Sequence, residues 1–192
     1  REIQVKEEDD VDDSDWMTRI LQSRAFLQVP PANIQAMFMR IQEVPMNEGE
    51  VVIKQGDIGD YYYIIKTGKA KVTRSSKTGS ELTLASLKDG DAFGEEALVS
   101  EAKRNATVIM DTAGTLMRLS KEDFNALLKE PMLNWLDLAK AQELIKSGAK
   151  WLDVRLESEH AKTGLKDSGN IPLFMLRLKV DTLDPNVPYI VY

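Results

Sequence analysis

The feature that most constrains the fold is a stretch from residue 48 to residue 120, in which glycines separate short β-rich runs. Seven of the eleven glycines lie between residues 49 and 94, where they mark the turns between these runs. Turns at a spacing of roughly 8–12 residues are typical of a small antiparallel sandwich, barrel or jelly roll. The predicted strands are residues 51–53, 61–65, 69–73, 81–87, 106–110 and 115–119.

Helical patterns precede this stretch. Ser14 is placed to cap a helix that carries Trp16 and Ile20 on one face. Two prolines then interrupt the pattern, and a second helix with Met37 on its apolar face is expected to continue as far as Pro45. We therefore expect two short helices in front of the β-rich stretch.

Helical patterns also follow it. Ser120 and Asp123 have the spacing of a capping box, and Pro131 is expected to close the helix that they begin. A further helix is expected from about residue 137 to residue 147, with Gly148 just past its end as a stop signal. The roll is therefore expected to be flanked by helices on both sides.

The last part of the chain differs in kind. Short buried-strand runs alternate with polar loops and helical runs, which is the start of an α/β pattern. These runs are residues 151–154, 171–173 and 189–192. The fold class predicted for the whole chain is α+β: a β-roll, or double-stranded jelly roll, flanked by helices and followed by a partial α/β segment. The predicted divisions are an acidic lead of residues 1–13, the helix-flanked roll of residues 14–133 and the α/β segment of residues 134–192.

Composition excludes several kinds of protein. There is no cysteine and only one histidine, His160, so a disulfide, a cysteine nucleophile and a histidine cluster for a metal are excluded. No run approaches the ~18 apolar residues that a membrane helix needs. The net charge of −6 arises within residues 1–15, which carry eight acids and two bases. Because the remaining residues sum to zero, no basic footprint for a nucleic acid is expected.

The stretch F-G-E-E-A-L-V-S-E-A-K-R-N-A-T-V, residues 93–108, carries the chemistry of an anion site. Gly94 permits a tight turn, and Glu95 begins a short helical turn whose N–H groups can face an anion. Arg104 can bring a guanidinium to the same anion, because its fork of donors matches a phosphate. The Glu95 carboxylate cannot bind a phosphate, but it can accept hydrogen bonds from a sugar hydroxyl beside one. The pattern therefore indicates a site for a phosphate joined to a sugar.

Residues 93–108 strongly resemble the phosphate-binding cassette of cyclic nucleotide-binding domains. Such domains occur in regulatory subunits of cyclic-AMP-dependent protein kinase, in the bacterial catabolite activator protein and in gated channels. Residues 49–72 look like the first hairpins of that family, with glycines in the expected turns. The resemblance implies a β-roll that binds cyclic AMP or cyclic GMP and uses no metal or other cofactor.

The resemblance also implies roles for single residues. Glu95 is expected to bind the ribose 2′-hydroxyl, and Arg104 is expected to bind the cyclic phosphate. The other candidate ligand-binding residues, mainly through backbone N–H groups, are Gly94, Glu96, Ala97, Asn105 and Ala106. The candidates for the wall of the pocket are Val72, Leu84 and Phe93.

Asn105 departs from the family pattern. Alanine at this position commonly accompanies cyclic AMP, whereas a threonine hydroxyl can favour cyclic GMP through the guanine edge. An asparagine side chain offers both a donor and an acceptor, so we favour cyclic AMP over cyclic GMP without excluding either. Trp135 either covers the base or packs between the two segments. The alternative is a vestigial roll in which Glu95 and Arg104 form a surface ion pair.

The C-terminal segment resembles the first half of a rhodanese-like domain. The resemblance rests on W-L-D-V-R-L-E-S-E-H at residues 151–160, G-N-I-P-L at 169–173 and P-Y-I-V-Y at 188–192. In that family the last of these strands is followed by the catalytic cysteine. This chain has no cysteine, so it is not expected to be an enzyme. We expect it to be a fragment of a longer protein.

The charged residues of this segment are interpreted as structural. Asp153 and Arg155 are expected to join a strand to the following loop by charge-assisted hydrogen bonds. His160 is expected to be a partly exposed helix residue without a catalytic role.

Together these features predict a cytoplasmic regulatory module that binds a cyclic nucleotide and relays it to a rhodanese-like domain. A homodimer is compatible with the sequence. The first alternative is a transcription regulator of the catabolite-activator type, which requires a basic helix-turn-helix after the roll. The second is a vestigial roll attached to a sulfurtransferase. A metal-dependent cupin is disfavoured because the single histidine lies outside the roll.

Overall fold

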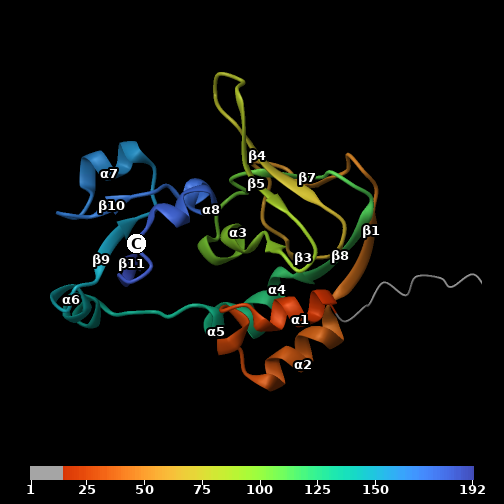
Figure 1. Ribbon diagram of the computed structural model, residues 1–192, viewed down its shortest axis with the longest axis horizontal. Helices are drawn as coiled ribbons and strands as arrows, with labels where there is room; N and C mark the ends of the chain where they lie inside the picture. The colour runs from red at the N-terminus through yellow and green to blue at the C-terminus, as the bar shows by residue number, and fades with distance from the viewer. Residues whose placement is uncertain (1–14) are drawn as a thin grey trace, which may run out of the picture. The chain divides into compact units, whose positions relative to one another are not determined.

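The computed structural model describes residues 15–192, so Ser14 and the acidic lead lie outside the described residues. Contacts divide the chain into two units (Figure 1). Among the described residues, the roll unit consists of those up to Lys71 together with Ser86–Leu133. The C-terminal unit consists of Val72–Ala85 together with Asn134–Tyr192. No helix among residues 15–192 is long and apolar enough to cross a membrane.

Three short helices begin the roll unit. They are α1 (Asp15–Gln22), the 3-10 turn η1 (Phe26–Gln28) and α2 (Pro31–Arg40). Pro31 stands at the start of α2, where its missing N–H removes no hydrogen bond. Both predicted helices are present, although the second one ends at Arg40.

The prediction that the second helix continues to Pro45 was wrong. Residues 42–46 form strand β1 (Gln42–Met46), which pairs antiparallel with β8 (Gly114–Ser120). β1 is the edge strand of its sheet, and an edge strand tolerates a proline because one side of its ladder has no partner. Pairing with a strand about seventy residues away decided the conformation here, and a local pattern cannot report such a partner.

Two four-stranded sheets form the β-roll, with strand orders β1-β8-β3-β6 and β2-β7-β4-β5. The six strands expected from the sequence are all present, and β1 and the two-residue β6 are additional. The remaining strands are β2 (Val51–Ile53), β3 (Tyr61–Thr67), β4 (Ala70–Ser75), β5 (Glu81–Leu87), β6 (Ala92–Phe93) and β7 (Thr107–Met110). The antiparallel register sets Tyr63 opposite both Phe93 and Arg118.

A hydrophobic core of the roll unit lies between β3 and β8 and the helices that cover them (Figure 1). Alternate residues of β3 point to opposite faces, so Tyr62 and Ile64 enter this core. The helices contribute Trp16, Met37 and Phe124, and each of them is buried. The apolar periodicity of the sequence therefore identified the buried helix faces correctly.

The helix after the roll contains three consecutive parts. They are α4 (Lys121–Phe124), the π-helical turn η2 (Asn125–Lys129) and α5 (Glu130–Met132). Ser120 caps its start as predicted, because the Ser120 Oγ accepts a hydrogen bond from the Asp123 N–H at 3.1 Å. We expected Pro131 to close this helix, but the helix continues through Pro131 to Met132. The proline lies inside the last turn, after a change of helical register.

The C-terminal unit contains a three-stranded parallel sheet of order β10-β9-β11. The predicted strand at residues 171–173 is displaced: β10 ends at Asn170, and Pro172 precedes a 3-10 turn. The elements of this segment are α6 (Leu138–Lys146), β9 (Lys150–Asp153), α7 (Glu157–Thr163), β10 (Gly169–Asn170), η3 (Leu173–Met175), α8 (Leu176–Lys179), η4 (Val180–Thr182) and β11 (Tyr189–Val191).

Candidate functional site

Gly94 forms the turn between β6 and helix α3 (Glu95–Ser100), as the sequence predicted for the anion site. Its φ of +89° lies in the left-handed region, which side chains with a Cβ rarely adopt. A Cβ on Gly94 would lie 3.0 Å from the Nη1 of Arg104 and 3.1 Å from the backbone oxygen of Tyr61. Glycine is therefore required here both by the turn and by the close packing of the guanidinium.

The Arg104 side chain is buried, with only 4% of its surface exposed. Its Nη1 donates to the backbone oxygen of Gly94 at 2.7 Å, and its Nη2 donates to the backbone oxygen of Tyr61 at 2.7 Å. Nη2 also donates to the Asp60 Oδ1 at 3.1 Å. A guanidinium has five N–H donors, so two of them make no hydrogen bond within residues 15–192. A charged group held by protein acceptors with donors remaining is suited to an anion.

Asp60 is the site residue that sequence reasoning missed. It is the ion-pair partner of Arg104, although its own side chain is 64% exposed. The Asp60 carboxylate also accepts the Tyr61 N–H, and the Asp60 backbone oxygen accepts the Lys121 N–H at 2.8 Å. Asp60 thus contacts both the cassette arginine and the start of α4. No local pattern marks it, because its partner lies 44 residues further along the chain.

The surface ion pair between Glu95 and Arg104 that the vestigial-roll alternative implies does not occur. Arg104 is buried and pairs with Asp60 instead. Glu95 is the first residue of α3, as expected from the sequence.

Asn105 and Glu96 form a pair beside the cassette. The Asn105 Nδ2 donates to the Glu96 Oε2 at 2.8 Å. This hydrogen bond assigns the amide donor of Asn105 to a carboxylate of the protein. Asn105, the residue after Arg104, is therefore bonded to α3 through Glu96.

The apolar candidates of the pocket wall are buried in their own strands. Phe93 stacks on Tyr63, with ring centroids 5.2 Å apart and ring planes 10° from parallel. Burial raises the pKa of Tyr63, and the Asp60 carboxylate raises it further. The other two wall candidates, Val72 and Leu84, are also buried, as are the ligand-binding candidates Ala97 and Ala106. Trp135, in contrast, is 64% exposed.

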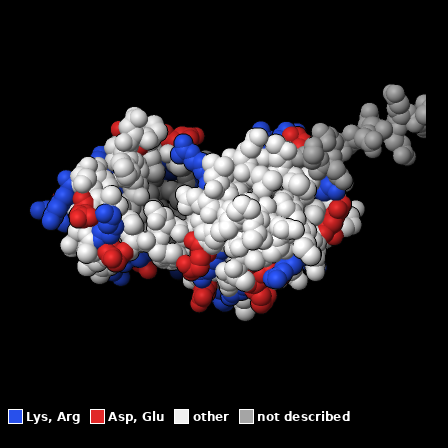
Figure 2. Space-filling model, turned by 90° about the horizontal axis from the view of Figure 1, so that it is seen from below, with Lys and Arg blue, Asp and Glu red and all other residues white. Residues whose placement is uncertain are grey.

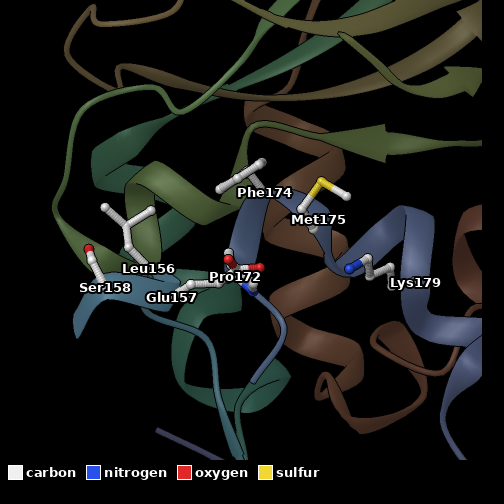
Figure 3. Close-up of a pocket in the computed structure, with 7 residues that line it drawn as sticks. All are labelled: Leu156, Glu157, Ser158, Pro172, Phe174, Met175 and Lys179. Carbon is white, nitrogen blue, oxygen red and sulfur yellow. The ribbon is translucent and has the colours of Figure 1, made fainter. Parts of the chain in front are cut away.

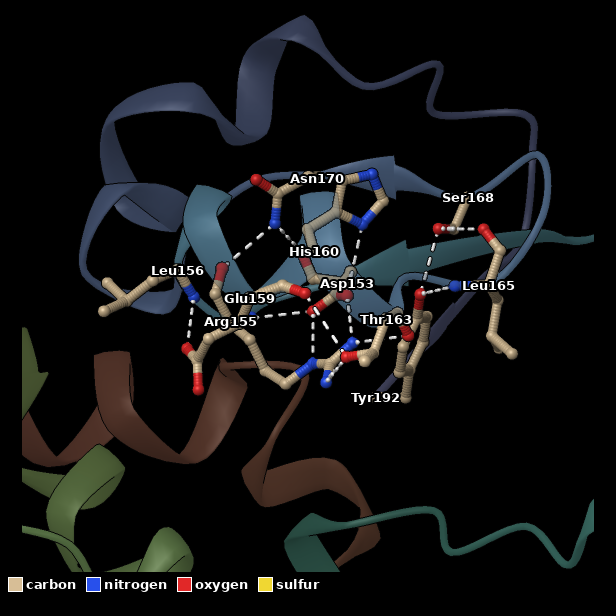
Figure 4. Close-up of polar contacts among 10 residues, drawn as sticks. All are labelled: Asp153, Arg155, Leu156, Glu159, His160, Thr163, Leu165, Ser168, Asn170 and Tyr192. Carbon is tan, nitrogen blue, oxygen red and sulfur yellow. Dashed lines mark hydrogen bonds and ion pairs between the residues drawn. The ribbon is translucent and has the colours of Figure 1, made fainter.

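The C-terminal unit holds a second polar cluster, centred on the fully buried Asp153 (Figure 4). The Arg155 Nε and Nη2 donate to the two Asp153 oxygens at 3.0 and 2.7 Å, and the Arg155 backbone N–H donates at 2.9 Å. This hydrogen bonding holds the pKa of Asp153 well below its usual range, against the opposing effect of burial. The predicted tie between strand β9 and its following loop is therefore present.

Further bonds of the cluster secure its loops. The His160 Nδ1 lies 3.2 Å from the Asp153 Oδ2, and the His160 side chain is partly exposed, as expected. Asn170 donates to the backbone oxygens of Asp153 and Arg155. The cluster is extensively bonded within the protein, which fits a structural role.

A cavity of about 400 Å³ lies in the C-terminal unit (Figure 3). Glu157 and Lys179 both line it, and neither side chain forms an ion pair within residues 15–192. It shares no residue with the cassette. The remaining lining residues are Leu156, Ser158, Pro172, Phe174 and Met175.

Charges on the face seen in Figure 2 are scattered, with a wide uncharged area and no extended basic patch. Residues 25–39, which include η1 and most of α2, contain no charged side chain. Within residues 15–192 there is also no group of three or more histidine, cysteine, aspartate or glutamate residues that could hold a metal ion.

Residues 43–130 match the family model described as "Cyclic nucleotide-binding domain". The cAMP-dependent protein kinase regulatory subunit of Schizosaccharomyces pombe is 39% identical over 108 residues, which are 56% of this chain and 24% of that protein. The Cyclic AMP receptor protein of Thermus thermophilus is 31% identical over 107 residues, which are 56% of this chain and 50% of that protein. The chain thus spans only a quarter to a half of the length of these relatives.

Solved structures show the same fold. The regulatory domain of Toxoplasma gondii PKA with cAMP has a TM-score of 0.59 and 27% identity, and covers 74% of this chain and 52% of that one. The Thermus thermophilus catabolite activator protein has a TM-score of 0.51 and 26% identity, and covers 67% of this chain and 59% of that one. Residues 43–130 thus resemble, in sequence and in fold, the cyclic nucleotide-binding domains of catabolite activators and kinase regulatory subunits.

Proposed function

We propose that this chain is a regulatory module that binds a cyclic nucleotide at the cassette around Gly94 and Arg104. The observation that carries the proposal is the buried guanidinium of Arg104, which is held by Gly94, Tyr61 and Asp60 while two donors remain. Burying a cation costs free energy, and a phosphate would supply the anion that compensates it. The bound phosphate would accept the two remaining N–H groups and the backbone N–H groups of the cassette.

The carboxylate of Glu95 would bind the ribose 2′-hydroxyl in the same complex. Glu95 is the first residue of α3 and directly follows Gly94, so it lies beside the proposed phosphate site. A carboxylate repels a phosphate and accepts hydrogen bonds from hydroxyls. The pair of Glu95 and Arg104 would therefore select a ligand in which a sugar hydroxyl and a phosphate are neighbours.

Cyclic AMP is the favoured ligand over cyclic GMP. Relatives named for cyclic AMP support this preference, among them the regulatory subunits of Schizosaccharomyces pombe and Yarrowia lipolytica. The cGMP-dependent protein kinase of Plasmodium berghei is also 37% identical over 97 residues, so both nucleotides belong in the test. We expect Asn105 to influence the choice between the two bases. Its amide donor bonds the Glu96 carboxylate in this structure.

The module would relay the binding of the ligand to a rhodanese-like segment. The parallel order β10-β9-β11, with α7 between β9 and β10, supports an α/β assignment for residues 134–192. The transcription-regulator alternative requires a helix-turn-helix at this place, and the parallel sheet disfavours one. The relay, the homodimer and the cytoplasmic location remain predictions.

Calorimetric titration with cyclic AMP and with cyclic GMP tests the proposal. We expect binding in the unsubstituted chain, loss of binding in Arg104→Ala, and unchanged binding in Arg24→Ala. Arg24 is an exposed arginine that makes no ion pair within residues 15–192, so it controls for loss of charge. No heat and no thermal shift with either nucleotide would favour the vestigial roll.

A further inference from the structure

The helix that follows the roll changes its register in the middle. It runs from Lys121 to Met132, but Asn125–Lys129 is a π-helical turn. An α-helical N–H bonds the carbonyl four residues earlier, whereas a π-helical N–H bonds the carbonyl five residues earlier. Such turns are rare and occur mostly as single-turn bulges inside α-helices.

Pro131 explains the change of register. In an α-helix, the residue that donates to the Leu127 carbonyl is residue 131, and a proline has no N–H to donate. The proline ring would also clash with that carbonyl. Asn33, from α2, supplies the missing donor, because its Nδ2 donates to the Leu127 oxygen at 2.9 Å. A side chain 94 residues away thus replaces a backbone hydrogen bond.

A second contact from α2 holds the same helix. The Arg40 Nη1 lies 2.7 Å from the Asp123 Oδ1, near the start of α4. Within the π turn, the Oδ1 atom of Asn125 is buried and accepts no hydrogen bond from residues 15–192. An unsatisfied buried acceptor is unfavourable. α2 therefore holds this helix at two points, of which the hydrogen bond from Asn33 to Leu127 lies within the π turn.

The π turn supports the cassette helix. Leu98 of α3 and Leu128 of the π turn are both fully buried, and they belong to one apolar cluster. The Lys129 Nζ lies 3.7 Å from the Glu101 Oε1, just past the end of α3. A change of register at residues 125–129 would rotate Leu128 out of this cluster. The surface against which α3 packs therefore depends on the register that α2 holds.

We propose that Asn33 is a positioning residue that replaces the missing N–H of Pro131 and so holds the π register beneath the cassette helix. This register keeps α3 in the position in which Gly94 and Arg104 form the anion site. The effect on ligand affinity rests on the proposed function, whereas the effect on the helix does not. The two parts can therefore be tested separately.

A double-mutant cycle tests the hydrogen bond itself. Asn33→Leu removes the donor, while Pro131→Ala restores a backbone N–H that can bond Leu127. In the full chain we expect Asn33→Leu to speed amide exchange at Leu128 by about tenfold. In a chain that already carries Pro131→Ala, we expect the same substitution to change this rate by less than about twofold. Equal effects in both backgrounds would overturn the proposal.

Two further variants control this cycle. Gln35→Leu changes an exposed amide of the same helix that makes no side-chain hydrogen bond within residues 15–192, and we expect no change in exchange. Asn33→Asp keeps the shape of the side chain and loses the donor, so it must behave like Asn33→Leu if the donor matters. An Asn33→Asp chain that exchanges as slowly as the unsubstituted one would contradict the assigned role.

Titration with cyclic AMP tests the link to the cassette. We expect Asn33→Leu to weaken binding by roughly threefold or more, and Pro131→Ala in the same chain to restore it. An unchanged affinity in Asn33→Leu would overturn that link. If the unsubstituted chain does not bind cyclic AMP, the proposed function fails, while the exchange cycle still decides the role of Asn33.

Discussion

The Nη2 of Arg104 lies 3.1 Å from the Oδ1 of Asp60, which joins a buried cation to a carboxylate at the protein surface. The same Asp60 contacts the first residue of α4 through its backbone oxygen. The cassette arginine is therefore connected to the helix after the roll by a single residue. An anion bound at the two remaining donors of Arg104 would share the guanidinium with Asp60.

Substitution of Asp60 tests the strength of this ion pair. Asp60→Asn should lower the free energy of unfolding by about 1 kcal/mol, because the carboxylate is exposed and two backbone acceptors of Arg104 remain. Urea denaturation measures the change. Asp57→Asn, at a nearby exposed aspartate whose side chain makes no hydrogen bond within residues 15–192, should leave stability within about 0.5 kcal/mol.

A Cβ at position 94 should damage the cassette. Gly94→Ala should lower the free energy of unfolding by about 2–3 kcal/mol, since the backbone is left-handed and the added carbon meets Arg104 and the backbone of Tyr61. Gly79→Ala is a matched control: its φ is +85°, but no atom lies within 4 Å of the added carbon. Equal losses in thermal denaturation would show that the contact adds nothing to the backbone strain.

Asp153 should make the C-terminal unit sensitive to acid. Its pKa is depressed in the folded chain, mainly by the hydrogen bond from Arg155. The stabilisation is therefore complete above the unfolded value of roughly 4, and it is lost as the pH falls below that value toward the folded pKa. Amide exchange at Leu152, measured between pH 5 and pH 2 and corrected for intrinsic rates, should show protection falling in this range.

Asp153→Asn should remove this pH dependence. Protection should already be lower at pH 5, by an amount equivalent to about 2 kcal/mol, because charge-assisted hydrogen bonds are replaced by weaker ones. Asp181→Asn, at an exposed position of η4, should follow the unsubstituted chain. A full acid slope in Asp153→Asn would assign the sensitivity to another carboxylate.

The cap at Ser120 should contribute a measurable part of the stability of the roll unit. Ser120→Ala removes the acceptor of the Asp123 N–H and should cost about 1 kcal/mol. Ser120→Thr retains a hydroxyl and should lose less than half of that in the same denaturation experiment. A loss as large as that of alanine would indicate a packing effect instead of a cap.

Local signals predicted much of the fold correctly. The strands were visible because glycine turns interrupt runs of β-forming residues, and the cap of α4 was visible because Ser120 and Asp123 stand three residues apart. The strand at 42–46 and the π turn at 125–129 were not predicted. Both depend on distant partners: β1 on its pairing with β8, and the π turn on Asn33 of α2.

The cassette shows the same division. The sequence by itself determined the turn at Gly94, the short helix that begins at Glu95 and the choice of Arg104 as a candidate anion ligand. Each of these depends on residue type and close spacing. Only the tertiary structure decided that Arg104 is buried and that it pairs with Asp60. The physical reason is that hydrogen bonds and burial depend on distance in space, and the residues that surround the guanidinium are brought together from β3 and from the turn at Gly94 by the closure of the roll.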